Sequence, residues 1–198
     1  MHGEIKLGRW LPFTAEQVIH RDRGMLWCAT VRMFGLPVRG FDSYLDGQGE
    51  MRWKMLGLIP IVTGSGPDIS RSALGRLQAE LVWLPSALCG PEVSWTSSSE
   101  YQTQAEFHLH GHAATLELAV DSVGRLHMVK MIRWGNPSGG AYESLPFGGI
   151  VEDESRFGGY TVPSRLRVGW YLGTERFDTE GDFFHVTVDD AVYRCGRR

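Results

Sequence analysis

Most of the chain alternates apolar and polar residues one by one, which is typical of β-strands with one buried face. After Trp27, every second residue up to Met33 is apolar, and the same alternation runs from Met51 to Met55. Other strands are predicted at residues 36–45, 58–62, 105–109, 114–120, 126–134, 150–157, 161–172, 183–188 and 191–194. The pattern as a whole predicts about ten strands.

One stretch, residues 65–88, departs from this alternation and predicts a helix. Its apolar residues recur at three- and four-residue spacing: Ile69, Ala73, Leu77, Leu81 and Leu84. Ser65 and Asp68 resemble a capping box, and Pro67 suits a first helical turn. Pro85 is expected to end the helix.

Two shorter segments also break the strand pattern. Thr14 and Gln17 resemble a second capping box, so residues 14–19 are expected to form one or two helical turns. Residues 135–149 are rich in Gly, Pro and Ser and are expected to form a loop or flap, with Tyr142 and Phe147 as its large aromatic side chains.

The number of strands and their one-sided alternation predict a mainly β protein with one main helix. A large antiparallel sheet twists and curls, so we expect a strongly curved, open half-barrel with the helix plugging its concave face. The length fits a single domain over residues 1–198. Because the chain opens almost directly into a strand, it is left open whether it is the C-terminal part of a longer protein.

The composition indicates which classes of partner and which cellular location to expect. A formal net charge of −3 leaves no basic excess for phosphates, so nucleic acid is not expected as a partner. Cys28, Cys89 and Cys195 are widely spaced without a CxxC motif, which argues against a disulfide scaffold and fits a reducing compartment. With no secretory signal pattern and no apolar run near the roughly 20 residues that span a bilayer, we expect no integral membrane segment and a cytoplasmic location.

Five segments together resemble a family of bacterial proteins classed as a domain of unknown function. They are AELVWLPSAL at residues 79–88, VSW at 93–95, RW at 133–134, PFGG at 146–149 and GGYTVPSRLRVGW at 158–170. This family carries no activity to transfer. More distantly, the layout is similar to the lipoprotein carriers LolA and LolB, whose half-barrel holds acyl chains beneath a helical lid, and to the cofactor-free enzyme VioE. These similarities imply a hydrophobic ligand or substrate.

The common catalytic motifs are missing: there is no GxSxG, P-loop, HExxH or strand-to-helix GxGxxG sequence. His108, His110 and His112 form the most conspicuous histidine cluster, and two of them would share one strand face. That face is the polar one, next to a turn, where solvated side chains are expected. We therefore expect no metal ion and no cofactor.

Polar residues of the helix are the stronger candidates for chemistry. Arg76 and Glu80 are four residues apart and can pair on the helix surface. If the helix plugs the half-barrel, Glu80 and Arg71 would instead face a cavity. Their candidate partners from the sheet are Arg133, Glu152, Arg156 and Tyr160. A carboxylate in an apolar cleft has a raised pKa and can act as acid or base; the alternative is a structural ion pair buried under the helix.

Three hypotheses follow. The first is binding of a hydrophobic small molecule, lipid or polyketide-like, between sheet and helix. The predicted ligand-binding residues are Trp53, Arg71, Trp83, Trp95, Trp134, Tyr142, Phe147, Arg156 and Trp170. The second is a cofactor-independent cyclase or isomerase of a hydrophobic biosynthetic intermediate, with Glu80, Arg133 and Tyr160 as catalytic groups. The third, favoured if the interior is fully packed, is a structural or partner-binding module. The ligand and the oligomeric state are left open.

Overall fold

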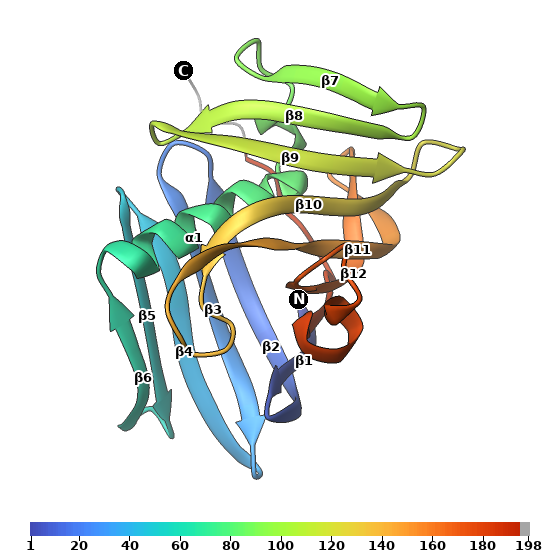
Figure 1. Cartoon of the computed structure of the whole chain (residues 1–198). Helices are drawn as coiled ribbons and strands as arrows, with labels where there is room; N and C mark the ends of the chain where they lie inside the picture. The colour runs from blue at the N-terminus through green and yellow to red at the C-terminus, as the bar shows by residue number, and fades with distance from the viewer. Residues whose placement is uncertain (195–198) are drawn as a thin grey trace.

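The computed structural model describes residues 1–194, in which thirteen strands form one antiparallel sheet around a single α-helix (Figure 1). The first six strands are β1 (His2–Leu7), β2 (Arg9–His20), β3 (Gly24–Met33), β4 (Leu36–Leu45), β5 (Gln48–Met55) and β6 (Ile59–Ser65). The helix α1 (Pro67–Glu80) follows. The remaining strands are β7 (Ser94–Ser99), β8 (Gln102–Leu109), β9 (His112–Val120), β10 (Leu126–Gly135), β11 (Glu143–Phe157), β12 (Tyr160–Trp170) and β13 (Asp182–Thr187). Cys195 lies outside the described residues.

The sheet consists of a first meander, β1 to β6, and a second meander, β7 to β13, joined in the middle of the sheet. The strand order is β6-β5-β4-β3-β2-β1-β13-β12-β11-β10-β9-β8-β7, so β1 pairs with β13 and the outer strands β6 and β7 do not pair with each other. Helix α1 crosses between the two meanders and contacts both β5 and β10 (Figure 1). The predicted fold, a curved open antiparallel sheet with a helix on its concave face, is therefore confirmed.

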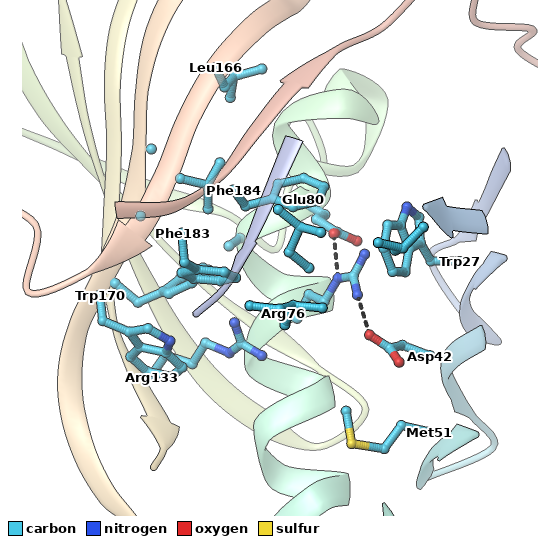
Figure 2. A pocket seen from close by; sticks show the side chains of 18 of the residues that line it. Trp27, Asp42, Met51, Arg76, Glu80, Arg133, Leu166, Trp170, Phe183 and Phe184 are labelled. Atoms are coloured by element: carbon cyan, nitrogen blue, oxygen red, sulfur yellow. Dashed lines mark hydrogen bonds and ion pairs between the residues drawn. The ribbon is translucent and has the colours of Figure 1, made fainter. Parts of the chain in front are cut away.

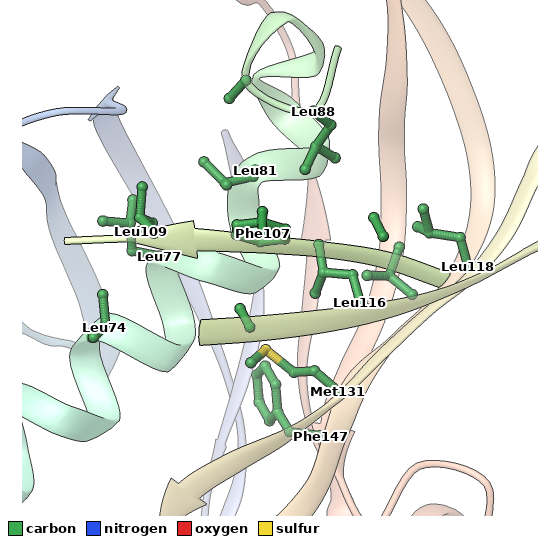
Figure 3. Packing of buried hydrophobic residues seen from close by; sticks show 14 of the residues in the cluster. Leu74, Leu77, Leu81, Leu88, Phe107, Leu109, Leu116, Leu118, Met131 and Phe147 are labelled. Carbon is green, nitrogen blue, oxygen red and sulfur yellow. The ribbon is translucent and has the colours of Figure 1, made fainter. Parts of the chain in front are cut away.

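The helix packs tightly against the second meander. Leu77 and Leu81 of the helical segment are fully buried, as is Leu116 of β9. Leu74, Phe107, Leu118, Met131 and Phe147 belong to the same cluster (Figure 3). This contact places one side of the helix against β8, β9 and β10. The opposite side of the helix therefore faces the strands of the first meander.

The helix is shorter than its apolar pattern suggests, and its ends differ from the prediction. Ser65 belongs to β6, and Gly66 is the N-cap residue without a side-chain cap, so the predicted capping box is wrong. Asp68 instead accepts a hydrogen bond from the Trp134 indole at 2.8 Å. Pro67 does occupy the first turn, as predicted. The α-helix ends at Glu80 and continues as two 3-10 turns, Leu81–Trp83 and Pro85–Ala87.

Three further sequence predictions are corrected. Residues 14–19 belong to β2 rather than to a helical turn, because pairing with β3 and burial of alternate residues outweigh the local capping signal. Residues 143–149 are strand rather than flap, since β11 begins at Glu143 and pairs with β10. Gly148 serves this close pairing: a Cβ there would collide with the Val129 carbonyl oxygen. Residues 191–194 form no strand.

Candidate functional site

A cavity of about 420 Å³ lies between the helix and the concave face of the sheet (Figure 2). Its wall combines strands from both meanders with the side of the helix turned away from the packed cluster. The aromatic side chains of this wall are Trp27, Trp53, Trp83, Phe147, Trp170, Phe183 and Phe184. Aliphatic residues such as Val31, Leu166 and Val168 complete it, so most of the surface offered to a ligand is apolar.

Three charged side chains meet at one side of the cavity, and we call them the Asp42–Arg76–Glu80 triad. The Arg76 Nε donates to Glu80 Oε1 at 2.7 Å, and its Nη1 donates to Asp42 Oδ2 at 3.1 Å (Figure 2). The guanidinium carbon also lies 4.9 Å from the centre of the Trp27 ring. Burial acts to lower the pKa of Arg76, but the charges and hydrogen bonds of Glu80 and Asp42 outweigh burial and raise it.

The carboxylate oxygens of the triad are all engaged in hydrogen bonds. Asp42 Oδ1 accepts from the Trp53 indole at 2.9 Å, and Glu80 Oε2 accepts from the Gln17 amide at 2.5 Å. Together with the two bonds from Arg76, every carboxylate oxygen has a partner. The arrangement holds both acids in fixed positions as charged acceptors, which is how a buried ion pair is stabilised.

Arg133 of β10 enters the cavity from the opposite side. Its Nε donates to the Ser72 carbonyl oxygen at 3.1 Å and its Nη2 to the Ser72 hydroxyl at 3.3 Å. The guanidinium carbon lies 4.4 Å from the centre of the Phe147 ring and 5.0 Å from that of Trp170. Gly75 leaves room for this crossing, because a Cβ at that position would come within 2.9 Å of Arg133 Cγ.

The environment of Arg133 disfavours its charge. Burial, and secondarily repulsion from Arg76, lower the pKa of Arg133 to about 9, although Glu80 and Asp42 act in the opposite direction. A pKa of about 9 still leaves the guanidinium protonated at neutral pH. The cavity therefore holds a cation on one side and a triad with a formal charge of −1 on the other.

Half of the residues predicted as a site line this cavity. These are Glu80, Arg133, Trp53, Trp83, Phe147 and Trp170. The structure brings together Glu80 and Arg133 from the predicted catalytic set, with Arg76 between them in the pair that the sequence left open as a simple surface contact. Arg76 thus belongs to the cavity wall rather than to the outer surface.

The other predicted site residues lie outside the cavity wall. Tyr160 packs on Tyr193, with ring centroids 4.5 Å apart, and Arg71 lies over the ring of Trp134. Trp134 in turn stacks with Tyr142. Trp95 is 48 % exposed and donates to the Leu88 carbonyl oxygen. Arg156 is exposed, and Glu152, which was considered as a partner of Glu80, pairs with Arg165.

Sequence reasoning missed Asp42 and Gln17. A signal for Asp42 was present: it lies two residues from Tyr44 and four from Val38, both buried, so strand alternation turns its carboxylate inward. It also lies directly opposite Trp27 in the β3–β4 pairing. An acid at an inward-facing strand position is a better indicator of a site than an acid on the polar face.

Two further features of residues 1–194 concern metal ligands and membrane-spanning helices. In this part of the chain, no group of three or more His, Cys, Asp or Glu side chains is arranged to hold a metal ion. His110 of the histidine cluster contacts the Arg21 carbonyl oxygen at 3.0 Å. None of the helices described here combines the length and the apolar character needed to cross a bilayer.

The fold and the cavity define a class of protein: an open antiparallel half-barrel with a helix on its concave face and a largely apolar cavity between them. Within that class, the chain belongs to a family of unknown function, DUF6920, whose model matches residues 1–193. This confirms the suspected membership of a domain-of-unknown-function family. Searches of curated proteins and of solved structures gave no match, so the similarity to LolA, LolB and VioE stays a prediction.

Proposed function

We propose that this protein binds a hydrophobic small molecule, lipid or polyketide-like, in the cavity between α1 and the curved sheet. The observation that carries the proposal is the cavity itself: about 420 Å³ lined mainly by aromatic and aliphatic side chains. Ligand pockets fall in a range of about 300 to 1,000 Å³ and combine apolar walls with a few polar groups. Closely packed interiors, in contrast, contain few voids larger than a water molecule.

The state of the two acids supports binding over acid–base catalysis. Each oxygen of Asp42 and Glu80 already accepts a hydrogen bond from Arg76, Trp53 or Gln17. A general base needs an oxygen within hydrogen-bonding reach of the proton that it removes. The cyclase or isomerase alternative would require this network to open, so binding is the simpler function of the cavity.

Filling the cavity tests the proposal. Val168 of β12 lines the cavity, whereas Val18 of β2 is 67 % exposed on the outer face, so V168W and V18W are a matched pair. With dodecan-1-ol as the probe in isothermal titration calorimetry, we expect V168W to bind at least about 10-fold more weakly than the wild type, which corresponds to about 1.4 kcal/mol. V18W should bind as the wild type does.

Two results would contradict the proposal. Equal binding by V168W and the wild type would place the ligand elsewhere on the molecule. Failure of the wild type to bind, together with the absence of any co-purifying hydrophobic molecule in native mass spectra of the protein from its own host, would remove the reason to regard the cavity as a ligand site.

A further inference from the structure

Arg133 is a charged group of the cavity that has no carboxylate in direct contact with it, although the triad carries a balancing charge across the cavity. Among residues 1–194, it makes no ion pair with a carboxylate, whereas Arg76 pairs with both Asp42 and Glu80. Figure 2 shows its guanidinium turned into the cavity, between Trp170 and Arg76. Exposed arginines of the same protein, such as Arg165 and Arg176, do form ion pairs. Arg133 therefore faces the ligand space without a carboxylate partner of its own.

The hydrogen-bonding capacity of Arg133 is also incompletely used. A guanidinium has five N–H donors, and the described contacts of Arg133 are the two to Ser72. The rings of Phe147 and Trp170 hold the group in place and interact favourably with its charge, but they do not neutralise it. Free N–H donors on a partly buried cation are costly unless an acceptor fills the site.

The surrounding charges indicate what kind of acceptor fits. The Asp42–Arg76–Glu80 triad carries a formal charge of −1, and its carboxylate oxygens are already engaged. A single negative charge placed beside Arg133 would be balanced by the single positive charge of its guanidinium. A dianion would place a second negative charge in a cavity whose other cation, Arg76, is already paired with Asp42 and Glu80, and where the net negative charge of the triad would repel it.

We propose that the ligand is an amphiphile with a monoanionic head group, a carboxylate, which pairs with Arg133 while its apolar part lies along the aromatic wall of the cavity. Arg–carboxylate pairs are often bidentate, so Arg133 would fix the orientation of the ligand as well as its charge. This inference rests on the proposed function and adds the chemical class of the ligand to it.

Probes that share a twelve-carbon chain and differ in head group separate the contribution of the head group to affinity from that of the chain. We would titrate the wild type at pH 7 with dodecanoate, dodecan-1-ol, dodecylammonium and dodecyl phosphate by isothermal titration calorimetry. Dodecanoate should bind about 10- to 100-fold more tightly than dodecan-1-ol, as expected for a charge-assisted pair. R133M should lose this preference but retain the affinity for dodecan-1-ol, and R133K should retain part of the preference.

R165M is the control, because Arg165 is an exposed arginine paired with Glu152 and lies outside the cavity; it should keep the wild-type preference. Equal affinity of the wild type for dodecanoate and dodecan-1-ol, or a preference for dodecylammonium, would overturn the inference and leave the proposed function standing. If dodecyl phosphate bound more tightly than dodecanoate, the choice of a monoanionic head group would be overturned. Binding of none of the four probes would instead count against the proposed function. If R133M did not fold, the comparison of probes on the wild type would still decide.

Discussion

The two sides of helix α1 face two different interiors. On one side, Leu74, Leu77 and Leu81 pack in a buried cluster with side chains of β8, β9 and β10 (Figure 3). On the other side, Arg76 and Glu80 face the cavity and the indole rings of the first meander (Figure 2). Aliphatic side chains interdigitate and close a core. Large rigid rings and paired charges hold the opposite wall apart, so one helix both stabilises the fold and borders a ligand space.

The largest expected effect is a difference in the free energy of unfolding between substitutions on the packed side of the helix and substitutions on the cavity side. Leu116 lies in the packed cluster and Leu166 lines the cavity, and both are buried leucines of β-strands. We expect L116A to lower the free energy of unfolding by about 3 to 5 kcal/mol, because it opens a void in a closed core. L166A should cost at least about 1 kcal/mol less, since its side chain already borders empty space. Urea unfolding measures both, and equal losses would contradict the distinction.

The next effect concerns the charges that border the cavity. R76M would leave Asp42 and Glu80 without their shared cation while they remain partly buried, at side-chain exposures of 22 % and 11 %. We expect a loss of about 2 to 4 kcal/mol in the free energy of unfolding. R165M, which breaks an exposed pair, should cost less than about 1 kcal/mol by the same measurement. A neutral R76M would mean that the triad does not stabilise the cavity wall.

The smallest effect is a pH dependence that arises from Arg133. Its pKa is lowered to about 9 in the folded protein, so between pH 9 and 12 the unfolded chain binds more protons than the folded one. The free energy of unfolding should therefore rise with pH in this range, by about 1 kcal/mol for each pH unit relative to R133M. Urea unfolding of both proteins between pH 7 and 11 measures this difference, in which the titration of other groups cancels. A constant or falling difference would contradict the burial of this charge.

The sequence predicts the fold well because alternation is a property of each strand by itself. It predicts less about the places where distant segments meet. The capping signal of Thr14 and Gln17 is local, whereas the pairing of residues 14–19 with β3 depends on the whole sheet. Gly148 likewise indicates a loop in isolation, but in the sheet it permits the close approach of β10. Both errors come from interpreting a residue without its cross-strand neighbour.

On the strands, the predicted site residues line the cavity where the prediction followed the rule that alternate residues point to the same face of the sheet. Arg133 and Trp134 were both assigned to the site, yet adjacent residues of a strand point to opposite faces. Arg133 faces the cavity, and Trp134 packs outside with Asp68 and Arg71. Asp42 could have been found by the same rule. The meeting of Gln17 with Glu80, 63 positions apart, could not have been found, because no periodicity relates two residues at that separation.

The junction between β1 and β13 has a consequence for the order of assembly. Every other neighbouring pair in the sheet is consecutive in sequence, whereas this one joins His2 to Thr187. During synthesis at about 5 to 20 residues per second, β1 to β6 can pair as they emerge, but the junction must wait for β13. Ile5 of β1 and Phe184 of β13 both line the cavity. The binding space is therefore completed only when this junction closes, so a chain under synthesis can hold a ligand only after β13 has emerged.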